Sequence, residues 1–429
     1  YKDSGVEWLG EIPSHWATCS LSKLFAIKAG GDVDLKNFSE DRSEEYPYPI
    51  YTNANNENSI YGYSKVANYQ ANSITVSGRG EVGFSVYRDH PFDAIIRLLV
   101  LTPQKECHPK FYAYYINEVI NFRVESSAIG QLSTLQISPY KTVLPAIDEQ
   151  KLIISFLDYE TAKIDNLIAK QEKLIELLKE KRQAVISHAV TKGLNPDVAM
   201  KDSGVEWLGQ VPEHWTVKPN KYLLDFVTSG SRGWAQFYAD TGSLFFRIAN
   251  LTRDTIEPKL ESLQFVEPPQ GSEGERSKIK IGDLLISITA DLGSVCVADS
   301  SIQNGYVSQH VALCRPQKLY NSRWLAYYIL SDSAKEQLLG SGYGGTKIQL
   351  SLEDIKELVI AVPPKEEQIL IANYIDEKLN QFEHLIKQAN KLVMTLQERR
   401  TALISSAVTG KIDLRNWQHP NEAKTELNL

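Results

Sequence analysis

Two glycine-rich strings are the residues whose spacing could hold a nucleotide phosphate. The sequences GRGEVG at 78–83 and GSGYGG at 340–345 both fit the G-x-G-x-x-G pattern, in which a strand precedes the glycines and a helix follows them. However, residues 84–88 alternate like a second strand, and no suitable helix follows the second string. Thr346 and Lys347 also stand in the wrong order for a phosphate-binding loop. We therefore predict that neither string binds a nucleotide.

The other candidate catalytic residues are dispersed along the chain. The eight histidines show no metal-ligand spacing, and the four cysteines include no CxxC pair, which favours small buried thiols in a reduced, cytoplasmic protein. His15 and His214 each precede a tryptophan, where a packed structural histidine fits better than a metal ligand. We find no Asn/Asp-Pro-Pro-aromatic motif of adenine methylases and no nuclease carboxylate–lysine cluster. The sequence thus predicts no metal site, no cofactor and no catalytic centre in this chain.

Length and charge limit the remaining classes of protein. The 429 residues fit two or more domains, and no run of about 18 apolar residues predicts a membrane span. The first residues lack a signal-peptide pattern, and because the chain starts at Tyr1 we expect a few native residues before it. The net charge of -7 disfavours a simple basic DNA-binding protein. A nucleic-acid reader of this charge would need local basic patches or partners that contact the phosphates.

The chain is one unit written twice. The nine residues KDSGVEWLG occur at 2–10 and again at 201–209, each followed by a Pro-x-His-Trp sequence. Further pairs follow in the same order: SGRGEVG at 77–83 with SITADLG at 287–293, AYYI at 113–116 and 326–329, Glu-Gln at 149–150 and 367–368, and SHAVT at 187–191 with SSAVT at 405–409. The offset between the copies grows from 199 to 218 residues, which indicates that loops lengthened between fixed framework pieces.

Each half combines a globular region with a long helical region. Short strand-like runs alternate with helix-like stretches in the globular regions, which predicts an α+β fold. We expect four parts, namely a first domain at 1–150, a long helix at 151–195, a second domain at 196–365, and a second long helix with a tail at 366–429.

The two long regions carry an apolar heptad seam. Apolar residues recur at alternating steps of three and four, at Ile164, Leu167, Leu174, Leu178 and Val185 in the first region, and at Phe382, Leu385, Leu392, Leu396 and Leu403 in the second. Neither region contains an internal Pro or Gly, while Gly193 and Gly410 follow their ends. We predict that the helices pair as an antiparallel coiled coil with a domain at each end and pseudo-two-fold symmetry. The alternative is that each helix packs separately on its own domain.

Three duplicated motifs carry a family resemblance. The KDSGVEWLG opening with its Pro-x-His-Trp, the Pro-x-x-x-Glu-Gln start of each long helix and the Ala-Val-Thr end resemble the specificity subunits of type I restriction-modification systems. The resemblance covers nearly the whole chain and includes the order of the parts. It implies that each globular half is a target recognition domain for one part of a split, asymmetric DNA sequence. The helix pair would then set the distance between the two parts.

The resemblance also implies partner subunits. Two modification subunits, which bind S-adenosylmethionine and methylate adenine, would dock against the helices and domains. Two restriction subunits, which use ATP and Mg²⁺ as motor-nucleases, would complete the restriction enzyme. This chain would itself bind double-stranded DNA without a cofactor and without catalysis. The partners could also wrap the duplex, which makes the net charge of -7 tolerable.

Candidate DNA contacts are polar, aromatic or basic residues in presumed loops. Asn can pair with adenine and Arg with guanine, while Ser and Tyr suit phosphates. In the first half these are Asn53, Asn55, Asn56, Tyr61, Tyr63, Ser77 and Arg79. In the second half they are Ser231, Arg232, Trp234, Arg247, Asn250, Tyr343, Thr346 and Lys347. Two other readings stay open: a coiled-coil scaffold whose domains bind proteins, and an enzyme that acts alone.

Overall fold

The computed structural model describes residues 1–53, 56, 58–122, 130–230, 232–268, 271–340 and 349–420, with the backbone only at 272, 273 and 339. Its contacts divide the chain into two compact units, Tyr1–Glu172 with Asn390–Leu429 (unit 1) and Lys173–Ala389 (unit 2). The division passes through two long helices, α4 (Ile147–Lys192) and α9 (Lys365–Val408). Each unit therefore holds one globular region and a part of each long helix.

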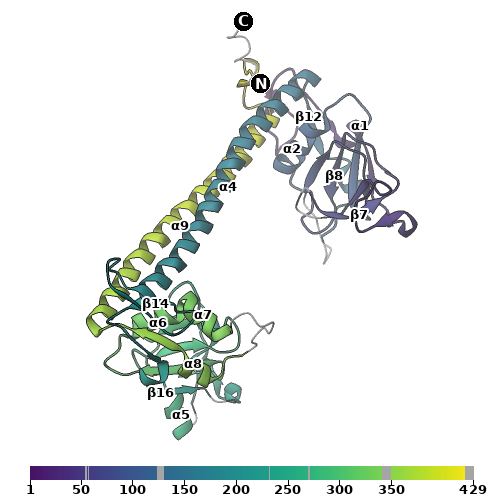
Figure 1. Cartoon of the computed structure of the whole chain (residues 1–429). Coiled ribbons are helices and arrows are strands. Elements are labelled where there is room, and N and C mark those ends of the chain that lie inside the picture. The colour runs from purple at the N-terminus through teal and green to yellow at the C-terminus, as the bar shows by residue number, and fades with distance from the viewer. Residues whose placement is uncertain are drawn as a thin grey trace. The chain divides into compact units, whose positions relative to one another are not determined.

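Unit 1 is built on two four-stranded sheets. The first is antiparallel, with the order β4 (Phe25–Ala29), β11 (Leu98–Pro103), β8 (Ser73–Ser77) and β9 (Ser85–Arg88). The second has the order β10 (Asp93–Ala94), β6 (Tyr48–Tyr51), β7 (Ile60–Ser64) and β5 (Phe38–Ser39), and β10 and β6 run parallel. Helix α2 (Pro109–Val119) packs against β8 and β9 (Figure 1). The smaller elements are β1 (Lys2–Asp3), β2 (Glu11–Ile12), β3 (Ala17–Ser20), α1 (Leu21–Leu24), η1 (Leu35–Asn37), α3 (Thr134–Ile137) and β12 (Lys141–Leu144).

Unit 2 repeats this topology with different strands. Its first sheet has the order β16 (Leu224–Ser229), β23 (Val311–Pro316), β20 (Leu284–Ser287) and β21 (Val295–Val297). Its second has the order β22 (Tyr306–Val307), β18 (Ser243–Phe246), β19 (Phe265–Val266) and β17 (Tyr238–Ala239), again with one parallel pair, β18 and β22. The other elements are β13 (Met200–Asp202), β14 (Gln210–Pro212), β15 (Thr216–Pro219), η2 (Asn220–Tyr222), η3 (Trp234–Phe237), η4 (Ile248–Asn250), α5 (Ser272–Ser277), α6 (Ser322–Leu330), α7 (Asp332–Leu339), α8 (Leu352–Glu357) and β24 (Val359–Val362). The predicted α+β class and the internal repeat are both confirmed.

Within each unit, α4 and α9 pack together and run in opposite directions. In unit 1, Leu157 near the start of α4 shares a core with Ile404 near the end of α9. In unit 2, Ile186 near the end of α4 shares a core with Ile371 near the start of α9. The absence of Pro and Gly inside either helix leaves the ladder of backbone hydrogen bonds free to run for more than 40 residues.

The buried line of the long helices differs from the predicted seam at four of its ten apolar positions. Six predicted residues are buried or half-buried: Ile164, Leu178, Val185, Phe382, Leu396 and Leu403. Four are exposed by 43–48%: Leu167, Leu174, Leu385 and Leu392. Their half-buried neighbours occupy the seam instead: Ile168, Ile175, Ile386 and Val393. The predicted seam is therefore corrected. Because two apolar residues stand side by side at each of these positions, the sequence fits either choice.

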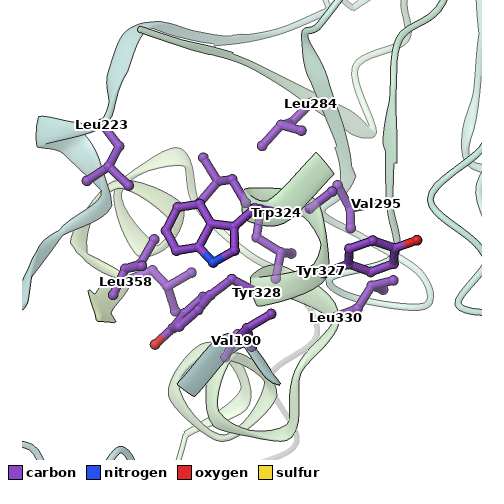
Figure 2. Packing of buried hydrophobic residues seen from close by; sticks show 14 of the residues in the cluster. Val190, Leu223, Leu284, Val295, Trp324, Tyr327, Tyr328, Leu330 and Leu358 are labelled. Carbon is purple, nitrogen blue, oxygen red and sulfur yellow. The ribbon is translucent and has the colours of Figure 1, made fainter. Parts of the chain in front are cut away.

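The core of unit 2 surrounds Trp324 on α6. Its side chain is fully buried, and Figure 2 shows Leu223, Leu358 and Tyr328 around the indole, with Val190 of α4 next to Tyr328. The last turns of α4 thus belong to the globular core of unit 2. Burying several aromatic and aliphatic side chains in this way stabilises a unit by about 1.5–3 kcal/mol for each one.

The duplicated motifs of unit 1 meet at one place, which we call junction 1 (Pro13, His15, Trp16, Glu149 and Gly410). The indole Nε1 of Trp16 donates to Oε2 of Glu149 at 2.9 Å, and Nε2 of His15 lies 3.1 Å from the same oxygen. Gly410, just after α9, has a φ of +74°, and a Cβ built on it would lie 2.5 Å from Pro13. The Pro-x-His-Trp sequence, the start of α4 and the end of α9 therefore contact one another at this junction.

Unit 2 makes the same contact at junction 2 (Pro212, His214, Trp215, Glu367 and Gly193). Nε1 of Trp215 donates to Oε2 of Glu367 at 3.1 Å, and Nε2 of His214 lies 2.9 Å from that oxygen. Gly193, just after α4, has a φ of +79°, and its Cβ position lies 3.3 Å from Trp215. Both histidines thus make the predicted structural hydrogen bond, but their side chains are 58% and 47% exposed and are not packed as expected.

The glutamine beside each junction carboxylate anchors the start of its helix. Gln150 is 1% exposed; it accepts a hydrogen bond from the backbone N–H of His108 at 2.8 Å and donates to the carbonyl of Pro145 at 2.9 Å. Gln368 is also 1% exposed and makes the equivalent pair of bonds in unit 2, at 2.8 and 2.9 Å. A buried amide needs partners for both of its polar atoms, which explains the repeated Glu-Gln pair.

A carboxylate on each long helix contacts a helix of the globular region, α2 in unit 1 and α6 in unit 2. In unit 1, Oδ2 of Asp158 lies 2.6 Å from Nζ of Lys110, and Oδ1 accepts a bond from the hydroxyl of Tyr114 at 2.8 Å. In unit 2, Asp376 accepts two bonds from the guanidinium of Arg323, at 2.8 and 3.2 Å. A two-point Arg–carboxylate contact fixes orientation more strictly than a single Lys contact.

Candidate nucleic-acid interface

In unit 1, the glycine-rich loop at 78–84 joins β8 to β9 as a hairpin. The strand β9 that follows the loop confirms the predicted second strand at this place. Gly83 has a φ of +93°, and its N–H donates to the carbonyl of Ser77 at 2.8 Å to close the turn. Ser77 is 1% exposed and its hydroxyl donates to the carbonyl of Glu81. Ser77, a predicted DNA contact, is therefore corrected to a residue that shapes the loop.

Arg79 is exposed in this loop, and Asn53 holds the loop in place. The side-chain oxygen of Asn53 accepts a bond from the N–H of Gly78 at 2.9 Å, and its amide donates to the carbonyl of Ile96 at 3.2 Å. The carbonyl of Arg97 lies only 2.3 Å from where a Cβ of Gly78 would be, so glycine is required there. Arg97, half-buried with a φ of +73°, thus lies beside Gly78, the residue before Arg79. No motif in the sequence pointed to Arg97, because this contact depends on the pairing of β8 and β11.

The other candidates of the first half lie on neighbouring segments. Tyr61 on β7 is 54% exposed, whereas Tyr63 is half-buried. The side-chain oxygen of Asn56 accepts a bond from a backbone N–H two residues later, at 3.1 Å, so it closes a local turn. Asn55 lies outside the described residues.

The equivalent loop of unit 2, between β20 and β21, has the same turn with a different charge. The N–H of Gly293 donates to the carbonyl of Ser287 at 3.1 Å, as in unit 1. Thr289 stands at the place of Arg79, and the loop carries Asp291, whose Oδ1 accepts a bond from Nε of Arg253 at 2.7 Å. Burial acts to raise the pKa of Asp291, but hydrogen bonds from Ser294 and Arg253 lower it overall. The two hairpins thus share an acidic residue, Glu81 in unit 1 and Asp291 in unit 2, and differ in that unit 1 has Arg79 where unit 2 has Thr289.

Burial corrects one of the candidates in the second half, Asn250, and largely encloses a second, Trp234. Asn250 is fully buried: its oxygen accepts from the N–H of Arg247, and its amide donates to the carbonyls of Lys259 and Ser262, each at 2.9 Å. Trp234 is 3% exposed and stacks on Phe245, with ring centroids 5.8 Å apart. Neither side chain lies on an open surface. Ser231, Tyr343, Thr346 and Lys347 lie outside the described residues.

Two candidates of the second half border one cavity, which we call the aromatic cavity. Its volume is about 330 Å³, and its walls include Trp234, Tyr238, Phe245, Arg247, Ser308 and His310. Arg232, which is exposed, precedes the first wall residues in sequence. The structure therefore brings together Trp234 and Arg247, which lie 13 residues apart in the chain.

Two classes of site are missing from the part of the chain that the structure describes. No group of three or more His, Cys, Asp or Glu side chains is arranged to hold a metal ion there. Among those same residues, no helix is long and apolar enough to cross a membrane.

Comparison with known proteins identifies the family to which this fold belongs. A model of the type I restriction modification DNA specificity domain matches residues 13–177 and 270–393, which together are more than half of the chain. The chain belongs to the type I restriction-modification DNA specificity family. The family resemblance of the duplicated motifs is thereby confirmed. Both matches begin in a globular region and end inside a long helix.

Known specificity subunits resemble between 31% and 96% of the chain. The EcoKI specificity subunit of Escherichia coli strain K12 is 22% identical over 96% of this chain and 92% of its own length. The EcoBI specificity subunit of Escherichia coli is 22% identical over 81% of this chain and 75% of its own length. A putative type I specificity subunit of Mycoplasma pneumoniae, S.MpnORF89P, is 34% identical over 31% of this chain and 39% of its own length.

Solved structures share the fold. A chain from a structural study of complex assembly and conformational transition in the type I R-M system superposes with a TM-score of 0.71 at 15% identity, over 94% of this chain and all of that one. The HsdS subunit from Thermoanaerobacter tengcongensis gives a TM-score of 0.51 at 15% identity, over 94% of this chain and 98% of that one. The specificity-family fold is therefore retained at low sequence identity.

Proposed function

We propose that this chain reads a bipartite, asymmetric DNA target, with each unit contacting one half of the sequence. The observation that carries the proposal is that junctions 1 and 2 are built from the same residues, whereas the hairpin loops of the two units differ in charge. A shared framework with unlike loops suits two half-sites with unlike bases. Reading two half-sites across a fixed gap follows from protein geometry, as in dimeric regulators.

The exposed Arg79 is the strongest candidate for a base contact in unit 1. The side chain of Asn53 and the N–H of Gly83 hold its loop by hydrogen bonds, and the side chain of Arg79 is exposed on this hairpin. Arg pairs with O6 and N7 of guanine in the major groove. Unit 2 carries Thr289 in that place, and we infer that it reads a different base there.

The paired helices are proposed to set the spacing and to bind the modification subunits. Leu167 and Leu174 on α4 and Leu385 and Leu392 on α9 are large apolar side chains that remain 43–48% exposed outside the seam. Exposed apolar patches of this kind favour protein contacts. S-adenosylmethionine, ATP and Mg²⁺ would belong to the two modification and two restriction subunits, and this chain would supply recognition without catalysis.

Domain exchange tests the proposal. Residues 1–150 would be replaced by the matching domain of another specificity subunit, and the methylated adenines of cells carrying the complex would be sequenced. We expect only one half of the methylated sequence to change. An unchanged sequence, or a change in both halves, would contradict one unit reading one half-site.

The rival reading is a scaffold whose domains bind only proteins. If Arg79 contacts a base, Arg79→Ala in the assembled complex should weaken specific DNA binding by about 1–3 kcal/mol, measured by fluorescence anisotropy at fixed salt. The matched control is Lys28→Ala, which removes one exposed positive charge from β4 of the same unit. Equal, small effects of both variants would favour the scaffold.

A further inference from the structure

Two residues that line the aromatic cavity of unit 2, Arg247 and Ser308, each carry a buried polar atom that has no hydrogen-bond partner. Ser308 is 5% exposed, yet its Oγ has no hydrogen-bond partner, and neither does the buried Nε of Arg247. Both residues line the cavity together with Trp234, Tyr238 and Phe245. A buried donor without a partner costs on the order of 1–3 kcal/mol, so folding alone does not explain why these two groups are unpaired.

Unit 1 lacks these groups at the equivalent positions. The parallel strand pairs β18–β22 and β6–β10 place Phe246 opposite Val307 and Tyr51 opposite Ala94. One residue further along each strand, Arg247 and Ser308 of unit 2 correspond to Thr52 and Ile95 of unit 1. The unpaired donors are therefore a property of unit 2 and not of the shared framework.

The chemistry of the cavity fits one class of ligand. Its aromatic walls suit a flat, aromatic molecule, and the N–H of Arg247 and the hydroxyl of Ser308 suit carbonyl and ring-nitrogen acceptors. Gln309 and His310 add further polar groups at the wall. We propose that the aromatic cavity binds a nucleobase, with guanine favoured because its O6 and N7 both accept hydrogen bonds.

The nucleobase comes from the DNA target, turned out of the duplex stack. This step rests on the proposed function, because unit 2 must contact a half-site for a base to reach the cavity. Bases removed from a stack are held in other proteins by aromatic side chains and by hydrogen bonds to the base edge, as the cavity offers. A free nucleotide carries the same ring, so the experiment must separate the two sources.

The test uses the chain assembled with its modification subunits and duplexes that carry the target sequence. Each duplex has one abasic site opposite one position of the half-site read by unit 2. Loss of the pairing partner lowers the cost of extruding a base. In anisotropy titrations, we expect the duplex with the abasic site at one particular position to bind roughly tenfold more tightly than the intact duplex. Duplexes with the abasic site at other positions should bind as tightly as the intact duplex or more weakly.

Two variants test whether this gain in affinity depends on the aromatic cavity. Ser308→Ala removes no hydrogen bond of the free protein, so its urea midpoint should not fall, while the tenfold gain disappears. Tyr238→Ala, at a position 45% exposed, provides a second variant that should also lose the gain. The control is Ser333→Ala, because the hydroxyl of Ser333 donates to the carbonyl of Trp207 at 3.2 Å. That variant should lower the urea midpoint and keep the gain.

Four outcomes would overturn the inference. The first is a complex that binds its target specifically but gains at no position, which leaves the proposed function intact. The second is a gain that survives both cavity variants. The third is binding of guanosine monophosphate that Ser308→Ala weakens, without any duplex gain, which would assign the cavity to a free nucleotide. The fourth is binding without sequence preference, which would sink the proposed function as well.

Discussion

Trp16 and Glu149 are 133 residues apart in the chain and joined by a 2.9 Å hydrogen bond between Nε1 and Oε2. Trp16 is 1% exposed, and its indole N–H donates its hydrogen bond to this carboxylate. The same bond between Trp215 and Glu367 in unit 2 shows that the bond belongs to the repeated framework. Each globular region is thereby tied to the first turn of the helix that follows it.

Removal of a junction carboxylate should destabilise its unit. In Glu367→Ala the fully buried Trp215 keeps an unpaired N–H, which costs about 1–3 kcal/mol. The measurement is the urea midpoint followed by tryptophan fluorescence. Glu366→Ala is the control, because Glu366 is exposed on the same helical turn and should change the midpoint little. Equal midpoints for the two variants would contradict the role of the junction.

The two helix-end glycines should tolerate a methyl group unequally. Gly410→Ala combines left-handed strain of about 1–2 kcal/mol with a Cβ 2.5 Å from Pro13, and overpacking adds about 1–3 kcal/mol. In Gly193→Ala the new Cβ lies 3.2 Å from its nearest atom, so this variant should lose less stability. Gly5→Ala isolates the strain, because Gly5 has a φ of +70° and nothing within 4 Å of its Cβ position. Thermal unfolding should rank the losses as Gly410, Gly193, Gly5, and any other leading residue would refute the packing argument.

The carboxylate on α9 should influence the spacing of the target. Asp376→Ala removes both bonds from Arg323, which would then keep only Glu257 at 2.7 Å. Loss of about 1 kcal/mol of orienting energy should make the complex about fivefold more tolerant of sites whose spacer is one base pair too long or short. Methylation rates on a spacer series measure this tolerance. Glu377→Ala, an exposed neighbour, should leave the tolerance as it is.

The cysteines should react slowly with alkylating reagents. Burial, with a smaller contribution from Cys19, raises the pKa of Cys107 to about 11, and burial raises the pKa of Cys314 to about 12. At pH 8 only roughly one Cys107 thiol in a thousand is the reactive thiolate, and this fraction grows about tenfold per pH unit until the pKa is approached. Iodoacetamide labelling at pH 8 and 9, read by mass spectrometry, should show that rise. Labelling of Cys107 as fast as in the urea-unfolded chain would contradict it.

The sequence by itself determined the architecture of this protein. Its nine-residue repeat, the Glu-Gln pairs and the uninterrupted helical regions sufficed for two α+β units with two long helices, and for the family. These features could be read because they depend on local periodicity and on identical residues that recur in the same order. Even the structural role of His15 followed from its place next to Trp16.

The tertiary structure alone decided which side chains face a partner helix, a core or solvent. Leu167 and Ile168 are equally apolar, and only the packed neighbour helix selects Ile168 for the seam. Asn250 has a residue type that suits a DNA contact, but it is fully buried, and its amide donates to the carbonyls of Lys259 and Ser262. The aromatic cavity likewise joins Arg247 to Ser308, 61 residues later, through one parallel strand pair. Burial depends on contacts between distant segments, and a linear pattern of residue types does not contain those contacts.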